Sequence, residues 1–285
     1  MSFDVQENNP QEDKTVELPQ GVIHYSDRGQ GPILVFVHGI LVNGLLWRDV
    51  VSELEDKFRC IVPDLPLGAH VQPMNADADL TPPGMARLVA DFLTALNLDE
   101  VTLIGNDTGG AICQLVIHHY PEKISRLVLT NCDAFENFLP LLLSPLQYAA
   151  RIPGFIFACS QVFSWSLARQ LTFGLLAYRS LKPEEESSYF TPLIRFDGVR
   201  RDLEKVVCSI SNRYTLEAAN SFPKFNKPVL IAWGEDDIFF GYQFAERLQE
   251  SFPNAKLERL KKSRAFIPAD KPELLAQLIA STVTG

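Results

Sequence analysis

The clearest pattern along the chain is an alternation of short apolar runs with longer stretches of helical spacing. Apolar runs of strand length stand at 33–37, 59–63, 100–104, 126–131, 229–233 and 257–260. Segments in which apolar residues recur every three or four positions follow them, at 43–58, 80–98, 109–120, 242–252 and 272–282. Continuous apolar runs are typical of strands buried on both faces, so the alternation predicts a mostly parallel sheet covered by helices.

Two segments depart from this alternation. Residues 15–25 alternate around a Leu18-Pro19-Gln20-Gly21 turn, which predicts a starting hairpin. Residues 136–213 hold no convincing buried strand and are rich in leucine and aromatic residues at helical spacing. We therefore expect a flexible tail at 1–14, a core domain formed by 15–135 and 214–285, and an inserted helical cap at 136–213.

Composition narrows the class of protein. A chain of 285 residues can bury a full core, and its net charge of -9 argues against nucleic acid or an anionic membrane as partner. The five cysteines form no C-x-x-C pair, which indicates free thiols in a reducing compartment. The polar, acidic N-terminal residues do not resemble a signal peptide, and no metal or nucleotide motif occurs. We expect a cytoplasmic protein without a cofactor or a metal.

The most informative motif is Gly105-Asn106-Asp107-Thr108-Gly109-Gly110, which directly follows the apolar run 101–104. A strand that ends in Gly-x-nucleophile-x-Gly and turns into a helix is the nucleophile elbow of α/β-hydrolases. Most such elbows carry serine. A carboxylate in this place attacks carbon electrophiles such as strained ethers or alkyl halides and forms an alkyl-enzyme ester. The alternative is that Asp107 only caps the following helix.

Four motifs in this order resemble an α/β-hydrolase with a cap. They are His38-Gly39, the elbow, Gly234-Glu235-Asp236-Asp237, and residues 263–268. The resemblance covers nearly everything after residue 15, and the aspartate elbow is similar to the haloalkane dehalogenase and epoxide hydrolase branch. It implies an α/β fold with a mostly parallel eight-stranded sheet, helices on both faces and an inserted helical cap.

The resemblance also implies roles for individual residues. The N–H groups of Ile40 and Thr108 would form the oxyanion hole, and Asp237 would be the late acid that orients the base. Asp133 lies near the place where some dehalogenases put this acid instead. Asp236 and Glu136 are neighbouring carboxylates, and each of these acidic residues could equally be a solvated loop side chain.

The chain departs from the family pattern at the base. Ser263-Arg264 stands where a Gly-His pair would carry the catalytic histidine, and an arginine cannot accept a proton. We expect Arg264 to lie between Asp237 and Asp107 and to lower the pKa of Asp107. Among the histidines, His70 could reach the cleft, whereas His38 is more typical of a turn-stabilising side chain.

The residues that distinguish the two branches are incomplete as well. Dehalogenases commonly carry tryptophan and asparagine at the positions of Thr108 and Ile40, and epoxide hydrolases commonly carry proline at the position of Leu41. Cap tyrosines are available, but core packing explains them equally well.

Three functions remain open from the sequence. The first is hydrolysis of an epoxide or haloalkane by Asp107 with a non-standard base. The second is a lyase or isomerase that uses Asp107 as general base. The third is a pseudoenzyme that only binds, because loss of one triad member can cost roughly 10⁴-fold in rate. The aromatic cap implies an apolar small-molecule substrate in each case. The oligomeric state is left open.

Overall fold

The computed structural model describes residues 13–285 and contains one sheet in the order β1-β2-β4-β3-β5-β6-β7-β8. Its first two strands form an antiparallel hairpin, β2 is antiparallel to β4, and all other neighbours are parallel. This confirms the predicted hairpin and the mostly parallel eight-stranded sheet. The strands are β1 (Asp13–Leu18), β2 (Gly21–Arg28), β3 (Ile33–Val37), β4 (Arg59–Pro63), β5 (Val101–Asp107), β6 (Ile124–Cys132), β7 (Val229–Gly234) and β8 (Ala255–Leu260).

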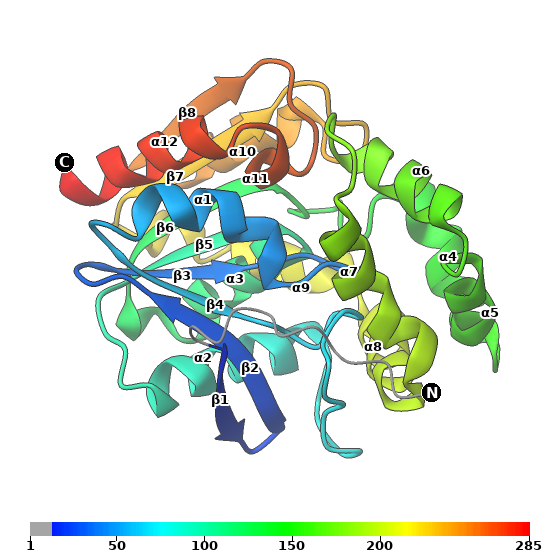
Figure 1. Ribbon diagram of the computed structural model, residues 1–285. Helices are drawn as coiled ribbons and strands as arrows, with labels where there is room; N and C mark the ends of the chain where they lie inside the picture. The colour runs from blue at the N-terminus through cyan, green and yellow to red at the C-terminus, as the bar shows by residue number, and fades with distance from the viewer. Residues whose placement is uncertain (1–12) are drawn as a thin grey trace.

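Helices cover both faces of the sheet. On one face α1, α11 and α12 pack together, and on the other α3 packs between α2 and α9 (Figure 1). The core helices are η1 (Gly44–Trp47), α1 (Arg48–Leu54), α2 (Pro82–Ala95), α3 (Thr108–His119), η2 (Pro121–Lys123), α10 (Tyr242–Ser251), α11 (Ile267–Asp270) and α12 (Pro272–Thr284). Thr81 caps α2, and its hydroxyl accepts the N–H of Gly84 at 3.3 Å.

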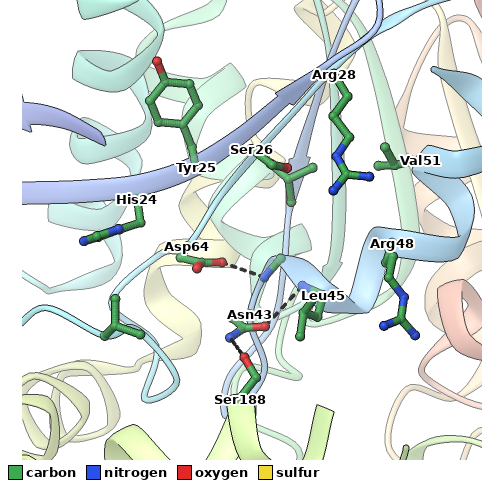
Figure 2. A pocket seen from close by; sticks show the side chains of 13 residues that line it. His24, Tyr25, Ser26, Arg28, Asn43, Leu45, Arg48, Val51, Asp64 and Ser188 are labelled. Carbon is green, nitrogen blue, oxygen red and sulfur yellow. Dashed lines mark hydrogen bonds between the residues drawn. The ribbon is translucent and has the colours of Figure 1, made fainter. Parts of the chain in front are cut away.

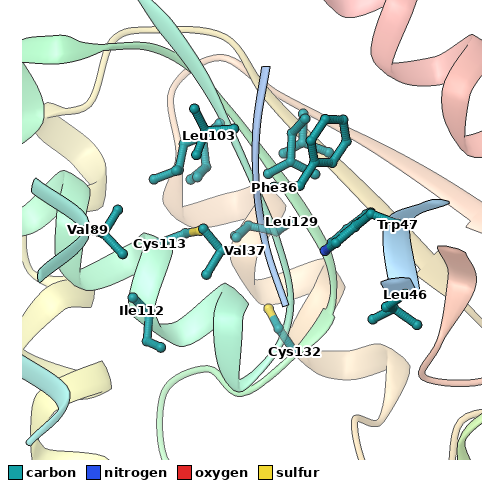
Figure 3. Close-up of a cluster of buried hydrophobic side chains, with 14 of the residues drawn as sticks. Phe36, Val37, Leu46, Trp47, Val89, Leu103, Ile112, Cys113, Leu129 and Cys132 are labelled. Carbon is teal, nitrogen blue, oxygen red and sulfur yellow. The ribbon is translucent and has the colours of Figure 1, made fainter. Parts of the chain in front are cut away.

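The core explains why the central strands read as unbroken apolar runs. Figure 3 shows Phe36, Leu103 and Leu129, from three neighbouring strands, between Trp47 on one side and Ile112 on the other. All five side chains are buried. Burial on both faces removes the period-two alternation, and a rigid platform results on which the strand ends can carry polar groups.

The segment between β6 and β7 consists of helices joined by turns and contains no strand, apart from an isolated bridge between Ala134 and Asn137. Figure 1 shows α4, α5 and α6 as the outermost layer, with α7 and α8 between them and the core. The helices of this segment are η3 (Leu141–Leu143), α4 (Ser144–Ala149), α5 (Phe155–Val162), α6 (Ser166–Leu176), α7 (Pro183–Arg195), α8 (Asp197–Ser209), α9 (Asn212–Ala219) and η4 (Phe222–Lys224).

Some boundaries differ from the prediction. Most of the predicted tail, 1–12, lies outside the described residues, and β1 already begins at Asp13. The helix predicted at 43–58 is two pieces, η1 and α1, and β5 continues past 104 to residue 107. The cysteines are free, as predicted. No helix within residues 13–285 is long and apolar enough to cross a membrane.

Candidate active site

Asp107 occupies the sharp turn between β5 and α3. Its backbone angles are φ 56° and ψ -134°, a left-handed conformation that an aspartate adopts only where the surrounding structure imposes it. A Cβ on Gly109 would come within 2.4 Å of the carbonyl oxygen of His38, so only glycine permits this approach of helix and strand. The elbow geometry that the motif predicted is therefore present.

The carboxylate of Asp107 lies against the loop that follows β3. Its Oδ2 accepts a hydrogen bond from the Ile40 N–H at 3.2 Å, and the Thr108 N–H also bonds this carboxylate. A Cβ on Gly39 would lie 2.2 Å from the same Oδ2, so a larger residue would displace the carboxylate. The two candidate oxyanion donors thus converge on Asp107 itself.

The loop that carries Ile40 is held from both sides. Leu41 has a φ of 60°, and its N–H donates to the Leu67 carbonyl at 2.9 Å. Asn43 accepts the N–H of Leu45 and donates 2.7 Å to the Ser188 hydroxyl on α7 (Figure 2). These bonds fix the direction of the Ile40 N–H.

Within the described residues, 13–285, no cation contributes to the electrostatics of Asp107. Burial raises the pKa of Asp107 to about 7, which the bonds from Thr108 and Ile40 only partly oppose and the nearby charge of Asp237 reinforces. The sequence-based expectation that Arg264 lowers this pKa is wrong in sign, because desolvation is the largest effect and no arginine contributes to it.

Two further carboxyl groups lie in the same region. Asp237 accepts the Asn131 side-chain amide at 2.7 Å and the Phe239 N–H at 2.8 Å, yet burial raises its pKa to about 6. Asp133 is fully buried and accepts only the Thr108 hydroxyl, at 3.3 Å, while its Oδ1 has no hydrogen-bond partner. Burial, followed by the charge of Asp107, raises the pKa of Asp133 well above its ordinary value.

Arg264 turns its side chain away from these carboxylates. Its guanidinium donates to the Gly174 carbonyl on α6 and lies 4.4 Å from the centre of the Tyr178 ring. Tyr178 in turn donates to Asp236 at 2.8 Å. The backbone that follows Arg264 nonetheless lies beside the elbow. The Ala265 carbonyl accepts a hydrogen bond, at 2.8 Å, from the side-chain amide of Asn106, which precedes Asp107 in the sequence.

Neither of the two candidate histidines contacts Asp107. His38 receives the Leu65 N–H on Nε2 at 2.8 Å, so its Nδ1 donates to the Gly39 carbonyl. Burial lowers the pKa of His38 to about 4, so this ring is neutral and structural. The Nε2 of His70 lies 3.3 Å from Asp202 on α8, and its Nδ1 is buried without a partner.

The sequence analysis missed two asparagines that hold the site together. Asn131 bonds both the N–H and the carbonyl of Gly234 as well as Asp237, and Asn106 links the elbow to the loop at Ala265. Their positions, at the end of β6 and inside the elbow motif, were the available signals. Within residues 13–285 no cluster of three metal-binding side chains occurs.

Two surface cavities lie away from Asp107. One, of about 270 Å³, is bordered by Arg28, Arg48 and Asn43 (Figure 2). The other, of about 900 Å³, lies along the edge of the cap beside Tyr148 and Arg213. Asp107, whose exposed fraction is 8%, lines neither of them.

Comparison with known proteins agrees with this geometry. The model of the alpha/beta hydrolase fold family matches residues 32–272. The chain belongs to the α/β-hydrolase family. Among curated relatives, haloalkane dehalogenase 2 of Mycobacterium tuberculosis is 28% identical and aligned over 95% of this chain and 94% of its own length. Cis-3-alkyl-4-alkyloxetan-2-one decarboxylase of Shewanella oneidensis is 30% identical over 87% of this chain and 80% of its own length.

A solved structure shares the fold. Epoxide hydrolase CorEH superposes with a TM-score of 0.79 over 95% of this chain and 97% of its own, at 19% identity. The family model and the curated relatives together identify the protein as an enzyme of the α/β-hydrolase fold.

Proposed function

We propose that the protein uses Asp107 to attack a saturated carbon that bears a leaving group, and so forms an alkyl-enzyme ester. The observation that carries this proposal is the bond from the Ile40 N–H to Oδ2 of Asp107. In a serine hydrolase these backbone donors receive the carbonyl oxygen of the substrate. Here an oxygen of the attacking residue already fills that position, so the arrangement favours substitution at carbon over acyl transfer.

The attacking step needs only the second oxygen of Asp107. A lone pair on Oδ1 forms the new C–O bond, and the leaving group departs with the electrons of the bond it breaks. A halide or the carboxylate of an opened β-lactone needs no proton. An epoxide oxygen needs a proton donor in addition. The attacking step therefore requires the fewest groups for an alkyl halide or a β-lactone as substrate.

Release of the ester distinguishes hydrolysis from elimination. Hydrolysis requires a base beside the ester, and in place of histidine we propose Asp237, whose pKa of about 6 suits a general base near neutral pH. Burial holds the pKa of Asp133 well above its ordinary value, which favours its neutral form and so limits the negative charge beside the ester. Arg264 would hold the cap against the loop and would not exchange protons.

A second candidate function is an elimination that needs no base. The residue at the histidine position is an arginine turned toward Gly174, and a relative at 30% identity is named an oxetan-2-one decarboxylase. Attack of Asp107 on the saturated ring carbon that bears the ring oxygen breaks that C–O bond, and opens such a lactone to an alkyl ester of Asp107 with a free carboxylate. Loss of CO₂ then converts the C–C bond electrons into a double bond, and Asp107 leaves as carboxylate. No water or proton is consumed.

Intact-mass spectrometry of the enzyme incubated with haloalkanes, epoxides and cis-disubstituted oxetan-2-ones tests the proposal. Wild-type enzyme is expected to gain the mass of one alkyl group, and the isosteric Asp107→Asn variant should gain none. Adducts or products formed equally by Asp107→Asn would overturn the assignment of the nucleophile.

A single turnover in H₂¹⁸O separates the two routes of release. Hydrolysis of the ester by attack at its carbonyl places ¹⁸O in the Asp107 carboxyl group, whereas elimination leaves that carboxyl group unlabelled and yields alkene and CO₂. Asp237 is supported as the base if ¹⁸O enters the Asp107 carboxyl group in the wild type and does not enter it in the Asp237→Asn variant.

A further inference from the structure

The cap exposes an unusual amount of apolar surface. Of the 17 large hydrophobic side chains that are exposed among the described residues, 12 lie between Leu141 and Tyr178, on α4, α5, α6 and the turns that join them. We call this surface the apolar cap face. Soluble monomers rarely expose contiguous apolar patches larger than a few hundred Å², so such a face indicates a partner.

The face follows the periodicity of a helix that is apolar on its outer side. Leu167, Leu171 and Leu175, one turn apart on α6, are exposed by 70%, 62% and 48%. The opposite side of the same helix is also apolar, since Phe173 is buried against the ring of Phe266 in the core. The inner side accounts for the packing of α6, and within residues 13–285 the outer stripe stays exposed.

Charge separates this segment from the rest of the chain. Residues 137–183 contain no aspartate or glutamate, although the chain carries 35 acidic residues and a net charge of -9. Three of the four basic residues there are neutralised, because Arg169, Arg179 and Lys182 pair with acidic residues outside the segment. Arg151 remains, exposed beside the ring of Tyr148.

The position of the face fits docking to an extended surface. In Figure 1, α4, α5 and α6 form the outermost layer of the molecule, on the far side of α7 and α8 from the sheet. Contacts of α5 with α7 and α8, of α4 with α8, and of α6 with α7 hold the inner sides of the three helices. Their outer sides can therefore meet a surface without rearrangement of the fold.

We propose that the apolar cap face docks the enzyme on a lipid–water interface. Exposed leucine side chains, a tryptophan and two tyrosines, with one free arginine and no acidic residue, are the composition of interfacial helices. The rest of the protein is acidic and is repelled by anionic lipid. It lies farthest from the membrane when the apolar cap face points toward the bilayer. Net charge alone argues against an anionic membrane as partner. That argument does not extend to the apolar cap face, because its docking depends on the burial of apolar side chains.

A second copy of the chain is the competing occupant. A stable dimer interface needs roughly 800 Å² per partner, with pockets that receive the large side chains. The three exposed leucines of α6 recur one turn apart, and the cavity beside Tyr148 is lined by none of them. A lipid surface requires no complementary pocket, which favours it.

Flotation of the full-length protein with vesicles tests the proposal. Wild type is expected to float with phosphatidylcholine vesicles, alone or mixed with phosphatidylglycerol, and to stay bound in high salt. The double variant Leu167→Glu/Leu171→Glu should lower the partition coefficient at least about tenfold, since two apolar side chains that would be buried in lipid become charged. The matched control is Leu274→Glu on α12, also exposed, at 43%, which should float like wild type.

Tryptophan fluorescence provides a second readout on the same samples. Trp47 and Trp233 are fully buried, whereas Trp165, on the apolar cap face, is 72% exposed. Vesicle binding should shift the emission to shorter wavelength, and Trp165→Phe should abolish the shift while the protein still floats.

Three outcomes would overturn the proposal. One is that wild type does not float with either kind of vesicle. Another is flotation that the double glutamate variant leaves unchanged. The third is a concentration-dependent dimer in sedimentation that the same variant dissociates, which would assign the face to a second copy.

Discussion

At the scale of single residues, the candidate site places three carboxyl groups in one buried region without a cation among them. Burial raises the pKa of Asp107, Asp133 and Asp237. The charge of Asp237 further raises the pKa of Asp107, and the charges of both raise the pKa of Asp133. Such groups titrate as a set, and the raised pKa of each favours its neutral form. The attacking step requires that Asp107 be the ionised member.

Ester formation should accordingly become faster as the pH rises. The pKa of about 7 means that only the minority of Asp107 is ionised at pH 6 and the majority at pH 8, so the rate constant should increase about tenfold between them. Quenched-flow mass spectrometry with a haloalkane measures this rate directly, because a halide needs no protonation. A rate that is constant over this range would contradict the raised pKa.

Asn131 is expected to be a positioning residue for Asp237. Asn131→Ala removes the three hydrogen bonds to Gly234 and Asp237, and should lower the free energy of unfolding by roughly 1–3 kcal/mol. It should also move the pH dependence of ester release to higher pH, because Asp237 loses a donor to its charged form. The control is Asn254→Ala, which removes an exposed hydrogen bond from the Asn254 side-chain amide to the Asn226 carbonyl. An equal loss of unfolding free energy in both variants would refute the positioning role of Asn131.

At the scale of elements, the cap and the loop before α11 are joined by α6. The Phe266 N–H donates to the Leu176 carbonyl at 2.7 Å, and Arg264 donates to the Gly174 carbonyl of the same helix. The residue at the catalytic-histidine position therefore bonds the cap. A displacement of α6 would therefore displace the loop that contacts Asn106 beside Asp107.

Arg264→Ala should loosen α6 without unfolding the core. The lost bond is worth roughly 1 kcal/mol, so the amides of α6 should exchange with solvent about fivefold faster, measured by hydrogen-exchange mass spectrometry. Arg259→Ala, which removes an exposed ion pair with Glu235 on the adjacent strand, is the control and should leave α6 unchanged. Unaltered exchange in both variants would show that Arg264 carries no cap contact of consequence.

The elements were predictable where the signal is local. A continuous apolar run predicted β3, because a strand buried on both faces needs apolar residues at successive positions. Closely spaced glycines predicted the turn at Asp107, because they permit backbone conformations and close approaches that other residues do not. The direction of the Arg264 side chain was not predictable, since it depends on a carbonyl ninety positions earlier in the chain. The raised pKa of Asp107 was missed for a similar reason, because burial is a property of the assembled fold.

The same distinction applies to the partners of the site residues. The family resemblance indicated Ile40 and Thr108, but their convergence on Asp107 itself follows only from the positions of two loops in space. Asn131 carries no motif of its own, and its contacts with Gly234 and Asp237 join residues about a hundred positions apart.

At the scale of the whole molecule, the buried carboxyl groups couple stability to pH. An aspartate with a folded pKa above its unfolded value binds more protons in the native state between the two values. Its contribution to stability is fully present below the unfolded pKa and is lost as the pH rises through the folded pKa. For Asp107 and Asp237 that window runs from near 3.8 to about 7 and about 6 respectively. His38 acts oppositely, since its lowered pKa removes stability as the pH falls.

Asp107→Asn should therefore stabilise the protein at alkaline pH at the cost of activity. Asparagine keeps an oxygen for the Ile40 N–H but never becomes charged, so at pH 8 the variant should exceed wild type by on the order of 1–4 kcal/mol in free energy of unfolding. Near pH 4 the two should converge, because wild-type Asp107 is then protonated in the folded state. Urea denaturation across this range measures the difference, in which the opposing contribution of His38 cancels. The exposed Asp77→Asn variant is the control, and its stability relative to wild type should not depend on pH in this way. An Asp107→Asn variant that is less stable than wild type at pH 8 would contradict the prediction, and would mean that the backbone donors around Asp107 compensate its buried charge.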